Sequence, residues 1–206
     1  MSRAEIRPYR PGDLDALYDI CLKTSASGGD ASHLHAEPRI VGEIYAAPYA
    51  VLRPDLALVI EDAEGVAAYM VGTDDTVAFD ARLEAEWWPR VRPLYADPKD
   101  IPFAARNADQ QRAARIHRPI ATPRPLTDAY PAHLHINLLP RLQGQGLGER
   151  LVTTWLDLLK ARGANGVHLG CSAGNARALR FYDRYGFRRF AVDPPWPGTV
   201  WMVLDL

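Results

Sequence analysis

A strand-like apolar run, a glycine-rich turn and an amphipathic segment follow one another at the start of the last third of this chain. The run ends at Leu138 and Leu139, and the turn at 143–148 reads Gln-Gly-Gln-Gly-Leu-Gly. From Leu147 onward apolar residues recur at three- and four-residue spacing, which predicts a helix over 147–162. Glycines let successive N–H groups point into such a turn, and a helix start carries a partial positive charge. The segment therefore predicts a cradle for a phosphate group between a strand and a helix.

Two common phosphate-binding motifs do not fit this turn. A dinucleotide fingerprint needs glycine at position 149 after Gly144 and Gly146, and this chain has Glu149 there. A Walker loop needs lysine and then serine or threonine after its last glycine, but Gly148 is followed by Glu149 and Arg150. A tight turn with a purely structural role is the remaining alternative.

Strands and helices alternate along most of the chain. Strands are predicted at 6–10, 56–61, 66–73, 133–139, 167–171, 187–192 and 200–204. Besides 147–162, helices are predicted after an Asp13 cap and at 39–46 and 175–185. This alternation is typical of an α/β sheet with crossover connections, and we predict one domain over residues 1–206.

Residues 74–131 interrupt this pattern and hold eight of the seventeen prolines. Helices are predicted there at 79–88 and 107–116, and the rest is expected to be loop. Irregular stretches of this length are usually functional or disordered. We interpret the segment as an insertion that covers a site, with a plain surface elaboration as the alternative. Trp87 and Trp88 are adjacent and cannot share one helix face.

Charge and composition exclude several classes of protein. The chain has 24 basic and 25 acidic residues and a net charge of −1, which argues against dedicated binding to nucleic acid or to a membrane surface. No apolar run approaches the roughly 20 residues of a membrane span. The two cysteines form no metal motif, and the polar start does not resemble a signal peptide. We expect a cytoplasmic protein, either monomeric or homodimeric.

Two motifs resemble the GNAT superfamily of N-acetyltransferases. The pattern Gln-x-x-Gly-x-Gly at 143–148 matches the loop that holds the pyrophosphate of acetyl-CoA in that family. The pattern Asn-x-x-Ala-x-x-Phe-Tyr-x-x-Tyr-Gly-Phe at 175–187 is similar to the family's next helix, and 6–13 is similar to its usual opening. More narrowly, 130–140 resembles bacterial acetyltransferases related to the C-terminal domain of eukaryotic O-GlcNAcases.

The resemblance implies a fold, a cofactor and several roles. The fold is a mixed, mostly antiparallel central sheet flanked by helices, and the cofactor is acetyl-CoA. Its pantetheine arm would lie against the strand that ends at Leu138, where splaying from the next strand frees backbone groups. Asn175 would bond that arm, or simply cap its helix, and Tyr182 would protonate the leaving thiolate or pack in the core. The residues expected to contact the cofactor are Leu138, Leu139, Gln143, Gly144, Gln145, Gly146, Leu147, Gly148, Asn175 and Tyr182.

Histidines supply the candidates for the general base. His133, His135 and Asn137 alternate along one strand and therefore share one face. We take His135 as the catalytic base, with a structural role as the alternative, and expect no metal because a third ligand is missing. The residues expected to bind the acceptor are Asp30, His33, Trp87 and His133.

These features together predict an acetyl-CoA-dependent N-acetyltransferase. We expect direct transfer in a ternary complex to a small-molecule amine or a protein lysine. A module that binds acetyl-CoA as a sensor or scaffold, without transferring it, is the alternative. A third alternative is a peptide-binding domain that uses the proline-rich segment. It is less favoured because it does not explain the glycine loop.

Overall fold

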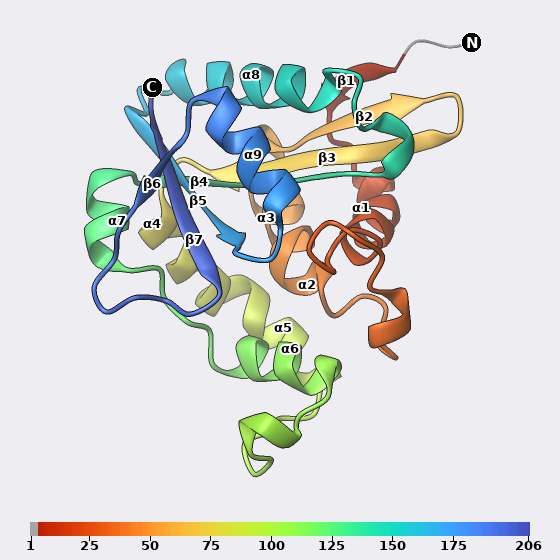
Figure 1. Ribbon diagram of the computed structural model, residues 1–206. Coiled ribbons are helices and arrows are strands. Elements are labelled where there is room, and N and C mark those ends of the chain that lie inside the picture. The colour runs from red at the N-terminus through yellow and green to blue at the C-terminus, as the bar shows by residue number, and fades with distance from the viewer. Residues whose placement is uncertain (1–3) are drawn as a thin grey trace.

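A seven-stranded sheet with strand order β1-β2-β3-β4-β5-β7-β6 forms the centre of the molecule (Figure 1). The computed structural model describes residues 4–206. Every neighbouring pair is antiparallel except β4 and β5, which are parallel. This confirms the mixed, mostly antiparallel α/β sheet. The strands are β1 (Glu5–Pro8), β2 (Leu58–Asp62), β3 (Gly65–Thr73), β4 (Ala132–Leu138), β5 (Gly166–Ser172), β6 (Arg188–Phe190) and β7 (Thr199–Asp205).

Helices cover both faces of the sheet. On one face α8 and α9 share a core with Ala68 and Met70 of β3, and on the other α1 to α6 share a core with Tyr69 and Val71. The alternation of β3 residues between the two cores follows from the pleat of the strand. The helices are α1 (Leu14–Leu22), α2 (Gly42–Tyr45), α3 (Ala47–Leu52), α4 (Thr76–Arg82), α5 (Trp88–Val91), α6 (Ala108–His117), α7 (Arg124–Ala129), α8 (Leu147–Lys160) and α9 (Ala176–Tyr185).

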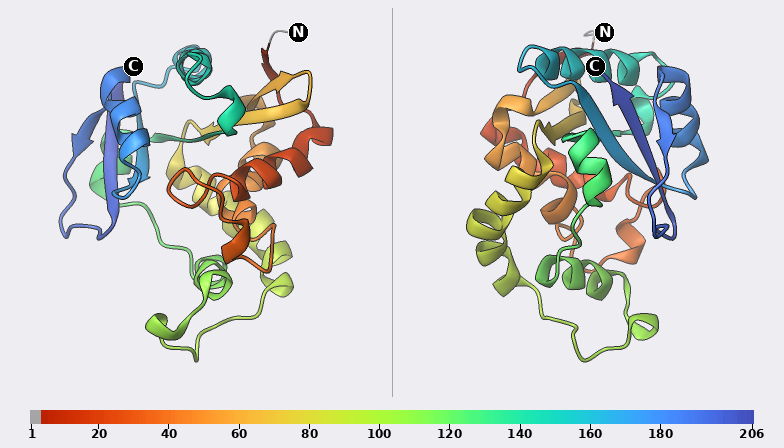
Figure 2. Two further views of the ribbon diagram at one scale, coloured as in Figure 1. Left: turned by 45° about the vertical axis from the view of Figure 1, so that its right-hand side comes forward. Right: turned by 90° about the vertical axis from the view of Figure 1, so that its left-hand side faces the viewer.

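The sheet opens between its two parallel strands. β4 and β5 pair only at Ala132 with Val167 and at His133 with His168, although both strands continue well beyond these pairs. In the left view of Figure 2, the C-terminal strands in blue stand at a steep angle to β2 and β3. The backbone of 134–138 on the side of β5 therefore has no strand partner. This is the splaying that the sequence resemblance implied.

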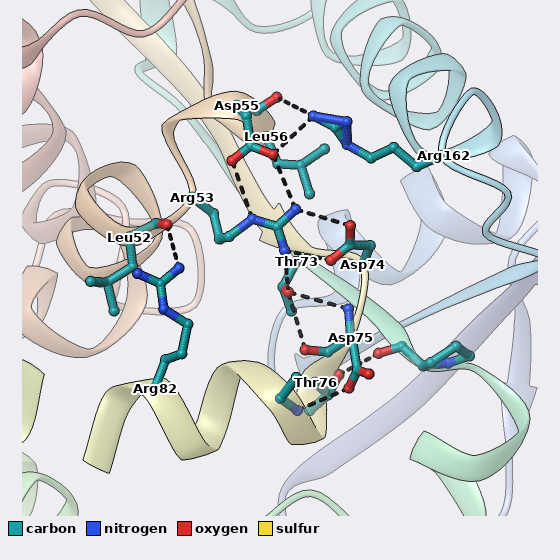
Figure 3. Close-up of polar contacts among 12 residues, drawn as sticks. Leu52, Arg53, Asp55, Leu56, Thr73, Asp74, Asp75, Thr76, Arg82 and Arg162 are labelled. Carbon is teal, nitrogen blue, oxygen red and sulfur yellow. Dashed lines mark hydrogen bonds and ion pairs between the residues drawn. The ribbon is translucent and has the colours of Figure 1, made fainter. Parts of the chain in front are cut away.

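Residues 74–131 leave the sheet and return to it at one place. The N–H of Thr76 donates to the carbonyl of Pro131 over 2.8 Å. Beside it, Arg53 binds the carboxylates of Asp74 and Asp55, and Arg162 reaches Asp55 over 2.9 Å (Figure 3). This ion network fixes the entrance of the segment. Figure 1 shows that its green middle part lies at the lower end of the molecule, away from α8.

Several boundaries differ from the sequence expectation. The predicted helix at 79–88 is divided into α4, a π-helical turn at Leu83–Trp87 and α5. The helix predicted at 39–46 is replaced by the short α2 and α3. Helix α7 falls in a region predicted to be loop, because Pro125 sits in its first turn, where a missing N–H costs nothing.

Asp13 does not cap α1 with its side chain. Its carboxylate instead accepts the N–H of Arg10 over 2.7 Å and pairs with Arg7 at 2.7 Å. Both carboxylate oxygens are therefore occupied by the Arg7 guanidinium and the Arg10 amide, which keeps them from the first turn of α1. None of the helices between residues 4 and 206 is long and apolar enough to cross a membrane.

Candidate active site

The glycine loop leads from the end of β4 into α8. Gly144 and Gly146 have φ values of 76° and 73°, a conformation that favours glycine, and a Cβ at either would meet no atom within 4 Å. Both residues are exposed, and Gly146 is the N-cap of α8. Within residues 4–206, no acceptor takes the amide protons of residues 144–149. The loop is thus an open row of N–H donors at a helix start, suited to an anion with several oxygens.

Gln143 joins this loop to its surroundings. Its Nε2 donates to the carbonyl of Leu138 over 2.7 Å, and its Oε1 accepts from Nη1 of Arg177 on α9. Arg177 has no carboxylate partner among the described residues, so its charge stays beside the loop. Arg141, in contrast, is neutralised by Asp62 at 2.8 Å.

Asn175 and Tyr182 belong to α9. Asn175 caps this helix, because its Oδ1 accepts the N–H of Ala178 over 3.0 Å. The Tyr182 ring is buried against Phe181 and Phe187, and burial raises the pKa of its hydroxyl. In the part of the chain that the structure describes, this hydroxyl makes no hydrogen bond. The cap role of Asn175 is therefore confirmed, whereas its contact with pantetheine stays a prediction.

A cavity of about 670 Å³ occupies the opening between β4 and β5. Its lining shares no residue with the glycine loop at 143–148. The lining from the sheet includes His133, His135 and Asn137 of β4, His168 to Ser172 of β5 and Thr199 and Trp201 of β7. The lining from residues 74–131 consists of Asp80, Leu83, Trp88, Arg112, Arg115, Pro119, Ile120 and Thr122.

A chain of hydrogen bonds connects both histidines of β4 to the wall of the cavity. The Thr76 Oγ1 lies 2.6 Å from the carbonyl oxygen of Pro131, and two oxygens this close need a hydrogen between them. Thr76 therefore donates to Pro131 and accepts from Nδ1 of His133 over 2.7 Å. His133 is left with a lone pair on Nε2, which accepts the Tyr49 hydroxyl over 2.8 Å.

The same chain ends at His135. Because the Tyr49 proton is used on His133, the phenol oxygen accepts from Nε2 of His135 over 3.1 Å. His135 thus carries its proton on Nε2, and its Nδ1 keeps a lone pair that no group among residues 4–206 occupies. Burial lowers the pKa of His135 to about 4, so the ring is neutral near pH 7. The site therefore presents an oriented, neutral imidazole with a free basic nitrogen.

The other two histidines of the cavity are also neutral. Burial lowers the pKa of His133 well below its ordinary value, with a smaller contribution from His168. Burial lowers the pKa of His168 to about 4, although its Nδ1 donates to the carbonyl of Tyr130 over 2.6 Å. Both rings therefore act as fixed, uncharged parts of the wall.

Sequence reasoning missed the charged groups that line the cavity. Burial, with a smaller contribution from Glu84, raises the pKa of Asp80 to about 6. The Nη1 of Arg112 donates to the Tyr45 hydroxyl over 3.2 Å, and its guanidinium lies 5.5 Å from the centre of that ring. The two arginines could have been found from their spacing: Arg112 and Arg115 are three residues apart in the predicted helix at 107–116, which places them on one face.

Three of the predicted acceptor residues lie elsewhere. Asp30 and His33 are exposed and do not line the cavity, and Asp30 accepts the N–H of Ser32 over 2.8 Å to close a local turn. Trp87 is buried in the core, where its Nε1 donates to the carbonyl of Glu43 over 3.0 Å. Its neighbour Trp88 lines the cavity instead, because adjacent helical residues point in different directions. Of the four, only His133 lines the cavity.

Comparison with known proteins agrees with this geometry. The model of the acetyltransferase (GNAT) family matches residues 124–187. The crystal structure of SsHAT has 39% sequence identity and a TM-score of 0.88, and the match covers 98% of each chain. The protein O-GlcNAcase of Rattus norvegicus is 23% identical over 95% of this chain, and the mycothiol acetyltransferase of Gordonia bronchialis is 29% identical over 66% of it.

This chain spans 21% of that O-GlcNAcase and 47% of that mycothiol acetyltransferase. Both the family resemblance and the narrower O-GlcNAcase resemblance are thereby confirmed. Solved structures that share the fold hold acetyl-CoA or coenzyme A. The open glycine loop has the donors that such a ligand needs. This chain therefore belongs to the acetyltransferase (GNAT) family.

Proposed function

We propose that this enzyme transfers an acetyl group directly from acetyl-CoA to an amine, with donor and acceptor bound together in a ternary complex. The observation that carries the proposal is the position of the cavity. It opens along the unpaired edge of β4, and the far end of that strand leads into the glycine loop. Two ligands that enter from opposite ends of one strand can meet at its middle, which converts the reaction into a step within one complex.

The residues around the loop bind the donor in this proposal. The amides of 144–149 and the guanidinium of Arg177 hold the pyrophosphate, while Gln143 keeps the loop against the end of β4. The unpaired backbone of 134–138 and the side chain of Asn175 position the pantetheine arm. Acetyl-CoA supplies the acetyl group as a thioester.

His135 serves as the base. Its Nδ1 accepts the proton of the attacking amine, while Tyr49 and His133 hold the ring through the bond to Nε2. A nitrogen that is bonding to a carbonyl becomes far more acidic, so a ring with a pKa of about 4 is basic enough to take its proton. Tyr182 of α9 then donates its proton to the leaving thiolate.

The residues at 74–131 form the acceptor wall of the cavity. Its volume of about 670 Å³ lies in the usual range for pockets that bind small molecules, roughly 300–1,000 Å³. We therefore place a small-molecule amine ahead of a protein lysine. A cytoplasmic location, a monomeric or homodimeric state, and the division into one domain with an insertion at 74–131 stay predictions.

The test measures the free thiol that is released from acetyl-CoA with a panel of amines. His135→Gln keeps a donor near the Nε2 position but removes the lone pair on Nδ1. We expect it to lower kcat by roughly 10²–10⁴-fold without weakening acetyl-CoA binding. His33→Gln is the matched control, because His33 is exposed and outside the cavity. Normal kcat in His135→Gln would reject this base. Binding of acetyl-CoA by the wild type without turnover of any amine would favour a sensor or scaffold.

A further inference from the structure

Helix α6 brings two arginines to the cavity that have no carboxylate partner among the described residues. These are Arg112 and Arg115. Two nearby arginines are paired: Arg92 binds Glu84 at 2.9 Å, and Arg118 binds Asp97 at 2.6 Å. Unlike these two, Arg112 and Arg115 face the cavity with their charges available to an anionic ligand.

Arg112 is held in place before any ligand binds. Its Nη1 donates to the Tyr45 hydroxyl over 3.2 Å, and its guanidinium lies 5.5 Å from the centre of the Tyr45 ring. Having accepted this bond, the Tyr45 hydroxyl has its own proton left to donate. Arg115 lies one helical turn further along the same face and is exposed. Together the three groups form a fork of donors that suits a carboxylate.

This fork lies beside the proposed base. The Tyr45 and His135 rings meet edge to face, with their centres 5.6 Å apart. The glycine loop contributes no residue to the cavity, so the fork is separate from the place where the pyrophosphate is expected. An anionic group bound by the fork would therefore belong to the acceptor.

A negative group completes the charge pattern of the cavity. Asp80 of α4 lines the same cavity, and its carboxylate makes no hydrogen bond or ion pair within residues 4–206. After burial, the negative charge of Asp80 further raises the pKa of the Tyr49 hydroxyl, which is hydrogen-bonded to both His133 and His135. The cavity thus presents cations and an anion to one ligand: the two arginines can pair with a carboxylate, and Asp80 can pair with an ammonium group.

We propose that the acceptor is a small zwitterionic amine of the amino-acid class, with its carboxylate bound by Arg112 and Arg115 and its amino group directed past Asp80 to Nδ1 of His135. This inference rests on the proposed function. It adds the chemistry by which the same site recognises its acceptor. The ammonium group first loses one proton to solvent, which frees the nitrogen lone pair. In the step itself this nitrogen bonds to the acetyl carbon, the carbon–sulfur bond breaks, the second amine proton passes to His135, and the thiolate takes a proton from Tyr182.

The test compares each amino acid in a panel with its own carboxamide, which keeps the ammonium group and loses the negative charge. We expect wild-type kcat/KM to be at least 10-fold higher for the acids. Arg112→Gln and Arg115→Gln should raise KM for the acids about 10-fold or more, leave KM for the amides unchanged and so abolish the preference. Arg118→Gln, directly after the same helix and outside the cavity, is the control. Asp80→Asn should raise KM for the acids and for the amides alike, because both kinds of substrate carry the ammonium group.

Calorimetry gives a readout that does not depend on turnover. With coenzyme A present, the preferred amino acid should bind to the wild type, and its affinity should fall at least 10-fold in Arg112→Gln. Equal use of acids and amides by the wild type, a preference that survives both arginine variants, or turnover restricted to protein lysines would overturn the inference. Acetylation of uncharged amines alone would overturn it while leaving the proposed function intact. Absence of turnover with every amine would count against the proposed function, and calorimetry would still decide whether the fork binds a carboxylate.

Discussion

Helix α8 has a glycine in the left-handed conformation at each end, which makes a matched pair of variants possible. Gly146 precedes the helix with a φ of 73°, and Gly163 follows it with a φ of 79°. A Cβ at either position would meet no atom within 4 Å. Alanine therefore brings no clash with the protein at either position, and the cost is the left-handed backbone alone.

The expected stability change is the same for both variants. A left-handed alanine costs about 1–2 kcal/mol, so each variant should unfold roughly 2–8 °C below the wild type. The effects on ligand binding should differ. A methyl group added at position 146 would lie beside the open amides of 144–149 and should keep an anion from them. Loss of one hydrogen bond to a charged group costs about 1.5–3 kcal/mol, which weakens coenzyme A binding about 10- to 150-fold.

Thermal unfolding and calorimetry with coenzyme A measure the two effects separately. Gly146→Ala should lose both stability and affinity, whereas Gly163→Ala should lose only stability. Unchanged affinity in Gly146→Ala would refute the assignment of the loop as the pyrophosphate cradle. Equal loss of affinity in both variants would show that binding follows the general stability of α8 and not the loop geometry.

Two further predictions concern Tyr182 and His168. Tyr182→Phe should lower kcat by roughly 10²–10⁴-fold, because it removes the proton for the leaving thiolate. Stopped assays measure this rate, and calorimetry should show unchanged acetyl-CoA affinity. A normal rate would leave Tyr182 with a packing role only. The buried His168 has a pKa of about 4 when folded, below the ordinary value of 6.5, so the unfolded chain binds a proton that the folded chain does not. Stability from this group is complete above pH 6.5 and is lost as the pH falls toward 4, by about 3 kcal/mol. Urea unfolding at pH 7.5 and pH 4 should show a smaller acid loss in His168→Asn than in the wild type, and equal losses in both proteins would contradict the assignment.

Local signals in the sequence predicted the glycine turn and the helix that follows it. The glycines at 144 and 146 favour a tight turn, which the structure forms with left-handed φ values, and the periodicity after Leu147 indicates a helix, so both could be predicted from neighbouring residues. The cap formed by Asn175 and the shared face of His133 and His135 follow from spacings of two or three residues in the same way. Such features depend on backbone conformation within one element, which a short stretch of sequence determines.

The acceptor side of the site was decided by the tertiary structure. The bonds from Tyr49 to His133 and from Arg112 to Tyr45 join residues 84 and 67 positions apart, and no local pattern predicts such pairs. The choice of Trp88 over Trp87 for the cavity depends on how the π-helical turn rotates the chain before α5. The free lone pair on His135 depends on the chain of hydrogen bonds that starts at the Pro131 carbonyl and ends at Tyr49. This chain forms only when the two ends of residues 74–131 meet. Short-range geometry thus determined the shape of the glycine loop, whereas the path of the whole chain decided which groups line the cavity.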